Sequence, residues 1–287
     1  MISPLRCLSI ALLALGLISC KPAAAPAKAS QRVITLAPHL AELVCAAAGC
    51  EMLVAVTSYS DFPPEITRLP VVGDVAQVNL EAVLALQPTQ VIVWEGGTPA
   101  AQRARLHTVK LPVTALRIEH LEDVADALVQ LGTLLGTPQR AQAAAADYRQ
   151  RLSALRVAHQ GARPVRVLYQ IATAPVYSIN RLSPISEAIS LCGGTNVFAD
   201  LPTIAAPVTD EAVLAARAQV VIHGPDSTAA VAAYWARFTQ ASETPPTLVA
   251  IDSDLLARAG PRLIEGVEQL CAALERVRHP ATALPTP

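Results

Sequence analysis

The chain is predicted to form two Rossmann-like α/β lobes with short parallel sheets, joined by a single long rigid helix. Two observations lead to this prediction. Strand patterns of apolar, β-branched residues alternate with helical patterns on both sides of a long segment that has no strand pattern. In addition, VNLEAVLALQPTQVIVW (78–94) recurs as VTDEAVLAARAQVVIH (208–223). Copies so far apart indicate two similar lobes, because solenoid repeats are much shorter.

Residues 1–20 have the pattern of an export signal. Arg6 supplies the positive charge, and 7–18 is an apolar run too short to span a bilayer. The run ends in Leu-Ile-Ser-Cys, which resembles the lipobox of bacterial lipoproteins, where cleavage leaves the cysteine first in the chain and lipid is attached to it. We therefore expect a lipoprotein signal peptide and a lipid on Cys20, which places the protein in the periplasm, anchored to a membrane. An ordinary signal peptide is the alternative.

The remaining chain divides into five predicted parts. A flexible tether occupies 21–30 and has no periodic pattern. An N-terminal α/β lobe (31–118), a helical connector (119–160) and a C-terminal α/β lobe (161–279) follow. A disordered tail at 280–287 is rich in proline and ends the chain.

The N-terminal lobe is expected to begin with a strand at 32–38. A helix at 40–48 follows, ends before Gly49, and leads to a second strand at 53–57. The first copy of the repeat then supplies a short helix and a strand. A further strand at 109–118 completes the lobe.

The connector carries helical patterns only. Gly136 and Pro138 interrupt it, and an alanine-rich helix is predicted over 139–159. A flexible hinge would require turn residues here, so the segment indicates a rigid strut. The first part of the connector has one apolar face, formed by Leu121, Val124, Leu128, Leu131 and Leu135.

The C-terminal lobe begins with a strand at 164–171 and a helix at 183–191. After the second repeat copy, a helix near 229–239 and a strand at 247–251 are expected. The last helix is predicted over 261–277, with Pro261 in its first turn. Its apolar face contains Leu263, Val267, Leu270, Cys271 and Leu274.

Cysteine usage fits an oxidising compartment. Of the six cysteines, Cys7 leaves with the signal and Cys20 carries lipid. Four remain, and they allow three disulfide connectivities: Cys45, Cys50, Cys192 and Cys271. Cys45 and Cys50 flank the end of a helix closely enough for a local bridge, and the other two would then pair in the second lobe. Free buried thiols are an alternative. A zinc site is disfavoured because no CxxC occurs and the histidines are scattered.

Several classes of function lack their usual signals. The net charge is −1 and no basic patch occurs, so nucleic acid is not an expected partner. Beyond the signal, no stretch is long and apolar enough to span a bilayer. The sequence also lacks a GxSxG elbow, HExxH, GxxxxGK and a GxGxxG after a strand. We expect no enzyme, no cofactor and no metal site; a periplasmic hydrolase is a remote alternative.

The repeat places one acidic residue in each lobe, Glu81 and Glu211. Each follows a capping residue, Asn79 or Thr209, and lies on the first turn of a helix, where the helix dipole stabilises a carboxylate. A single copy would indicate only a favourable helix start. The pair, one on each lobe, favours a role on the surface of both lobes. Two facing lobes also form a cleft, which is where a ligand binds.

Several segments together resemble a known family: RVITLAPHLAEL, VTSYSDFPPE, NLEAVLALQPTQVIVWEGG, LCGGTNVF, VTDEAVLA and SDLLARAGPRLIEGVEQLCAAL. In order and spacing they are similar to the substrate-binding proteins of bacterial ABC importers with a single helical connector. That family serves cobalamin, siderophores and haem, and the resemblance is strongest to its cobalamin-binding branch. It implies a monomer that captures cobalamin or a related corrinoid and delivers it to the permease dimer of an importer.

The resemblance also implies roles for individual residues. Glu81 and Glu211 match two glutamates that dock onto permease arginines, a pairing that suits bidentate recognition. Cys192 and Cys271 fall where the cobalamin-binding branch has its disulfide. The ligand-binding positions of the family match Pro38, His39, Tyr59, Trp94, Tyr177, Asp254 and Arg258.

Several of the ligand-binding expectations have alternatives. Tyr59, Trp94 and Tyr177 could each be core residues instead. Asp254 and Arg258 are spaced i,i+4 and could form only a surface ion pair. His39 could ligate a metal-centred cargo or form an ordinary hydrogen bond. The family cleft also has tryptophans at three positions that correspond to Val75, Ala205 and Leu255 here. A less aromatic cleft leaves a ferric siderophore or haem as the alternative cargo.

Overall fold

The computed structural model describes residues 31–74, 76–238 and 245–279. The expected signal peptide, the lipid on Cys20, the tether and the C-terminal tail lie outside these residues. Across the described part of the chain, no helix has the length and apolar character needed to cross a membrane.

The N-terminal lobe is built on a four-stranded sheet in the order β2-β1-β3-β4, and every pairing in it is parallel. Its strands are β1 (Val33–Thr35), β2 (Leu53–Ala55), β3 (Gln90–Trp94) and β4 (Val113–Leu116). The accompanying helices are α1 (Pro38–Ala46), α2 (Leu80–Ala85) and α3 (Ala100–Thr108), with short 3-10 turns η1 (Cys50–Met52) and η2 (Pro64–Arg68). Strands β1 and β3 are almost wholly buried, which explains their continuous apolar sequence.

The C-terminal lobe has a second parallel sheet in the order β11-β10-β5-β8, and a three-stranded antiparallel sheet in the order β6-β7-β9. The parallel strands are β5 (Val165–Tyr169), β8 (Gly194–Asn196), β10 (Val220–His223) and β11 (Thr247–Ala250). The antiparallel strands are β6 (Ala172–Thr173), β7 (Val176–Ile179) and β9 (Ala205–Val208). The helical elements are α6 (Pro184–Leu191), α7 (Asp210–Ala215), η3 (Pro225–Ser227), α8 (Thr228–Ala236), α9 (Ser253–Leu256) and α10 (Leu263–Arg278).

The two parallel sheets have equivalent topology, which confirms the interpretation of the sequence repeat as two similar lobes. In each lobe the strand of the repeat, β3 or β10, lies between the first strand and the last strand of the sheet. The repeat helices are capped alike: Asn79 accepts a hydrogen bond from the N–H of Ala82, and Thr209 accepts one from that of Ala212. Matching φ values of 46° at Gln87 and Arg217 end both helices.

The equivalence extends to a pair of arginines. Arg32 donates from Nε to the carbonyl of Leu86 at 2.9 Å, and Arg166 donates from Nε to the carbonyl of Ala216 at 3.0 Å. Each arginine therefore satisfies a free carbonyl at the end of its repeat helix. The sequence repeat does not include these arginines, so sequence comparison of the two copies missed them.

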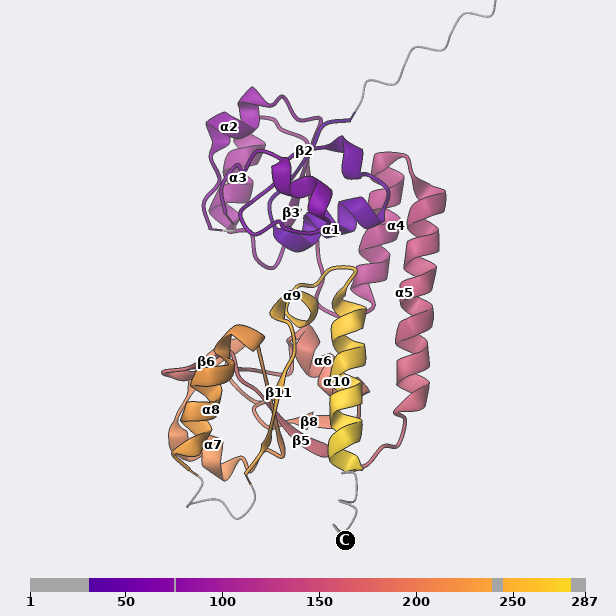
Figure 1. The fold of residues 1–287 in the computed structure, drawn as a ribbon. Helices are drawn as coiled ribbons and strands as arrows, with labels where there is room; N and C mark the ends of the chain where they lie inside the picture. The colour runs from indigo at the N-terminus through magenta and orange to yellow at the C-terminus, as the bar shows by residue number, and fades with distance from the viewer. Residues whose placement is uncertain (1–30, 75, 239–244, 280–287) are drawn as a thin grey trace, which may run out of the picture. The chain divides into compact units, whose positions relative to one another are not determined.

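The connector contains two helices, α4 (Asp123–Leu135) and α5 (Pro138–Ala158), which lie side by side (Figure 1). Gly136 ends α4 in a left-handed conformation with a φ of 74°, and Pro138 begins α5. Helix α4 packs against α1, so the single helix that runs on from one lobe to the other is α5.

Side chains attach α5 to both lobes. Just before α5, Thr137 donates a 2.6 Å hydrogen bond to the carbonyl of Ala47 in the first lobe. Farther along, Arg151 forms a bidentate pair with Glu268 of α10, at 2.9 and 2.7 Å. The rigidity of this connection stays a prediction.

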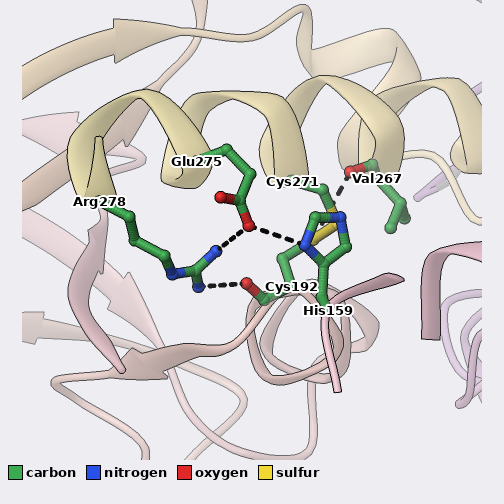
Figure 2. Close-up of a disulfide and its surroundings, with 6 residues drawn as sticks. All are labelled: His159, Cys192, Val267, Cys271, Glu275 and Arg278. Atoms are coloured by element: carbon green, nitrogen blue, oxygen red, sulfur yellow. Dashed lines mark hydrogen bonds and ion pairs between the residues drawn. A yellow bond between two sulfur atoms is a disulfide. The ribbon is translucent and has the colours of Figure 1, made fainter. Parts of the chain in front are cut away.

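Both expected disulfides are present, Cys45–Cys50 and Cys192–Cys271. Figure 2 shows the second one, with Cys271 on the inner face of α10 as its apolar pattern predicted. Beside it, Arg278 donates to the carbonyl of Cys192 and pairs with Glu275, which also contacts His159.

Several expected boundaries were wrong in physically informative ways. Helix α1 starts at Pro38, two residues earlier than expected, because proline suits the first helical position. The expected strand at 109–118 shortens to β4 because Val109 is the C-cap residue of α3 and Lys110 has a left-handed φ of 57°, so the extended backbone begins only later. Helix α10 begins after Pro261, with Arg262 at the N-cap position.

Candidate ligand cleft and docking glutamates

The ligand residues expected in the first lobe follow the carboxyl ends of three neighbouring strands. Pro38 and His39 follow β1, Tyr59 follows β2, and Trp94 ends β3. In open parallel sheets, the crevice outside the carboxyl ends of the strands is where ligands bind. The fold therefore brings these four residues to one edge of the sheet.

His39 is a buried, uncharged imidazole beside Trp94. The two rings meet edge to face, with centroids 5.0 Å apart. Burial, reinforced by the positive charge of Arg258, lowers the pKa of His39 to about 4. No described residue forms a hydrogen bond with its Nε2. A neutral, unpartnered imidazole nitrogen at the sheet edge is able to accept a proton donor or to bind a metal centre.

Trp94 is held by a tight turn. The backbone N–H of Trp94 donates to the side-chain hydroxyl of Thr98 at 3.1 Å. The backbone N–H of Thr98 donates back to the carbonyl of Trp94 at 2.8 Å. A Cβ at Gly97 would overlap the indole ring. This glycine is therefore required where the indole folds over the backbone of the turn.

Tyr59 is 80 % exposed and has a φ of 66°, in the left-handed region that non-glycine residues rarely adopt. The flanking residues fix this conformation: Ser58 donates to the carbonyl of Gly73 at 2.8 Å, and Ser60 donates to that of Thr57 at 3.3 Å. A large ring held in solvent on a strained turn is a typical binding feature, and packing against the described residues does not account for it.

The wall of the second lobe includes a cavity of about 340 Å³ at the carboxyl ends of β5 and β10. Among its lining residues are Tyr169 and Gln170, and Gln170 is oriented by a 3.0 Å hydrogen bond from the indole N–H of Trp235. Sequence reasoning missed these residues. The equivalence of β5 and β1 is the signal that could have identified them, because β1 precedes the expected residues of the first lobe.

Tyr177 lies on the antiparallel sheet and not at the end of a parallel strand. It is 37 % exposed and pairs in register with Ala172 and Pro207. The exposed apolar side chains Ile171 and Ile204 flank this sheet, and both are linked to it by backbone hydrogen bonds. They extend the apolar surface around Tyr177 and were also missed from sequence.

Asp254 and Arg258 form the i,i+4 ion pair expected from their spacing, at 2.8 Å. Arg258 also binds Asp61 of the first lobe through two contacts of 2.6 and 3.2 Å, and it approaches Glu42 at 3.4 Å. The hydrogen bond from Arg258 lowers the pKa of Asp61, whereas burial raises that of Asp254. The pair is therefore part of a larger ionic contact between lobes.

Glu81 and Glu211 are both exposed on the first turns of α2 and α7. Backbone hydrogen bonding, with help from the Thr209 side chain, lowers the pKa of Glu211. The two carboxylates thus occupy equivalent positions, one on each lobe. Within the described residues, no group of histidine, cysteine and acidic side chains is arranged to hold a metal ion.

Residues 33–233 match the model of the periplasmic binding proteins. The chain belongs to this family. It is also 35 % identical over 263 residues to the vitamin B12-binding protein of Pectobacterium carotovorum, covering 90 % of this chain and 92 % of that protein. The protein of the same name from Vibrio cholerae is 34 % identical over 247 residues, covering 86 % and 90 % of the two chains. The chain is thus a solute-binding protein of the periplasm and not an enzyme.

Two solved structures show the same fold. The periplasmic vitamin B12-binding protein of Vibrio cholerae superimposes with a TM-score of 0.78 at 32 % identity, covering 86 % of this chain and 98 % of that one. A periplasmic haem-binding protein from Roseiflexus gives a TM-score of 0.77 at 25 % identity, covering 87 % and 99 %.

Proposed function

We propose that this chain captures cobalamin, or a related corrinoid, in the periplasm and delivers it to an ABC importer. The observation that carries the proposal is the match of about nine-tenths of the chain to vitamin B12-binding proteins. The expected ligand residues of the first lobe support it, since they share one sheet edge, as does the Cys192–Cys271 disulfide.

In this proposal, affinity comes from apolar burial with a few polar anchors. Tyr59 and Trp94 contact the corrin from the first lobe, with Pro38 and His39 beside them. Tyr177 and the residues that line the cavity of the second lobe contact the ligand from the other side. Of the three expected departures from the family's tryptophans, Val75 lies outside the described residues, Ala205 is exposed on β9, and Leu255 is buried in α9.

Delivery uses the equivalent carboxylates of Glu81 and Glu211, which bind arginines on the two halves of the permease dimer. Their exposure on the first turns of α2 and α7 supports this role. The protein acts as a monomer, and a lipid on Cys20 keeps it close to the membrane.

Haem is the second candidate cargo, and one observation favours it: the buried, neutral imidazole of His39 has no partner at Nε2 within the described chain. Haem iron commonly takes such a ligand. An anionic siderophore is disfavoured, because Arg258, the cation expected in the cleft, is already bound by three carboxylates.

Titration calorimetry with cyanocobalamin, haemin and a ferric siderophore in parallel tests the proposal on the purified protein. We expect a tight complex with cyanocobalamin. Tyr59→Ala should weaken it about tenfold, whereas Tyr59→Phe, which keeps the ring, should not; the exposed position makes a folding defect unexpected. Absence of heat with cyanocobalamin, together with tight haemin uptake, would establish haem as the cargo instead.

A further inference from the structure

Glu42 is a buried carboxylate that binds the opposite lobe. It lies on α1 with only 2 % of its side chain exposed. Arg262, just before α10 in the second lobe, donates to it from Nε at 2.9 Å and from Nη2 at 2.8 Å. This bidentate geometry fixes both the distance and the relative orientation of the two groups.

A second arginine strengthens the same contact. Arg258 reaches Glu42 at 3.4 Å and binds Asp61 with two hydrogen bonds. The Arg262 guanidinium also stacks on the ring of Phe62, 4.0 Å from its centroid. We call Glu42, Asp61, Arg258 and Arg262 the interlobe clasp.

The backbones of the two lobes also come close together at the clasp. A Cβ at Gly260 would lie 3.4 Å from Cβ of His39 and 3.5 Å from Oε2 of Glu42. Segment 257–262 of the second lobe therefore rests directly on α1, with the two arginines of the clasp on either side of Gly260.

The elements joined by the clasp are those that border the candidate cleft. Helix α1 begins with Pro38 and His39, whereas Ser253 and Ala257, on the other side, line the cavity of the second lobe. Any shift of segment 257–262 relative to α1 therefore changes the separation between the two cleft walls.

We infer that Glu42 is a positioning residue that sets the width of the ligand cleft by holding segment 257–262 against α1 through the interlobe clasp. The role of Glu42 in ligand retention rests on the proposed function. Its role in restraining the two lobes is independent of that function. Glu42 is the centre of the clasp, because it is bound by both arginines and is its most buried carboxylate.

Hydrogen–deuterium exchange on the ligand-free protein tests the restraint directly. Glu42→Gln should speed exchange of the backbone amides in 257–263 at least tenfold, because glutamine has a donor NH2 group in place of one of the two oxygens that accept hydrogen bonds from Arg262. Asp61→Asn should act in the same direction with a smaller effect, and its exposed position makes a folding defect unexpected. Amides of the buried strands β5 and β10 should keep their protection.

The matched control is Glu268→Gln, which removes another bidentate glutamate–arginine pair, the one with Arg151 on α5. It should leave exchange in 257–263 unchanged. Equal acceleration in the control, or equal loss of protection in β5 and β10, would overturn the inference and indicate a general contribution to folding.

Stopped-flow measurements with cyanocobalamin then test the link to ligand retention. Glu42→Gln should raise the dissociation rate constant about tenfold and change the association rate constant much less. An unchanged dissociation rate would overturn the positioning role. If the unsubstituted protein binds no cyanocobalamin, the proposed function fails, and the exchange experiment still decides whether the clasp restrains the lobes.

Discussion

The two disulfides should contribute very unequally to stability. Cys192–Cys271 joins residues separated by 79 positions, and Cys45–Cys50 joins residues separated by only 5. A cross-link stabilises a protein mainly by restricting the unfolded chain, and the restriction grows with the logarithm of the loop length. On this basis, the long loop contributes ~4.5 kcal/mol to the free energy of unfolding and the short loop ~2 kcal/mol.

The folded structure around Cys192 and Cys271 should be retained when their disulfide is removed. Arg278, Glu275 and His159 form a hydrogen-bonded group next to it, and Arg278 also donates to the carbonyl of Cys192 (Figure 2). The backbone at Cys192 therefore stays attached to α10 without the sulfur–sulfur bond. The loss should thus come mainly from the unfolded state and not from local rearrangement.

Urea unfolding under non-reducing conditions measures the difference between Cys192→Ala/Cys271→Ala and Cys45→Ala/Cys50→Ala. The first variant should lose more than twice as much unfolding free energy as the second. Adding a reductant to the first variant should cost only the contribution of the short loop. Equal losses, or a larger loss for the short loop, would refute the loop-length argument.

Three further predictions follow from the candidate cleft and the docking surface. The pKa of His39 is about 4 in the folded protein against 6.5 for the free side chain, so its neutral form adds up to ~3 kcal/mol of stability above pH 6.5. That contribution is lost as the pH falls from 6.5 to 4, and urea unfolding of His39→Gln should show a flatter pH profile in this window. Gly97→Ala should displace the indole that it supports and weaken ligand binding measured by calorimetry, with a smaller change in melting temperature. The double variant Glu81→Ala/Glu211→Ala should abolish stimulation of the importer ATPase and leave ligand affinity intact. Loss of both ATPase stimulation and ligand binding would instead indicate that the glutamates contribute to folding.

Features that depend on local sequence could be predicted well. The repeat, its caps and the buried strands β3 and β10 are encoded within short windows, because caps and apolar periodicity act between near neighbours. The local Cys45–Cys50 bridge is of the same kind.

Weakly amphipathic or very short elements escaped prediction. Helix α3 buries only Leu106, so it has no apolar stripe to reveal it. The antiparallel strands β6, β7 and β9 are two to four residues long, too short for a periodic pattern. Their pairing depends on tertiary contacts, which also created the apolar surface around Tyr177.

The contacts of Arg258 show most clearly what could not be predicted from the sequence. From sequence it could be matched with Asp254 four residues away, but its partners Asp61 and Glu42 are 197 and 216 positions distant. No local pattern relates charges so far apart. The ionic contact between lobes therefore became visible only in the folded chain.

The strut and the interlobe clasp together limit how the cleft can open. Helix α5 is attached to both lobes, and we predict that it resists bending, so that only small movements between the lobes occur. The contacts of the clasp lie at 2.6–3.4 Å, and a hydrogen bond is lost once its atoms separate beyond about 3.5 Å. A displacement of about 1–2 Å at segment 257–262 is thus enough to break the clasp while α5 stays intact. A rigid α5 is therefore compatible with release of the ligand. In the proposed mechanism, release requires the interlobe clasp to break and does not require α5 to bend.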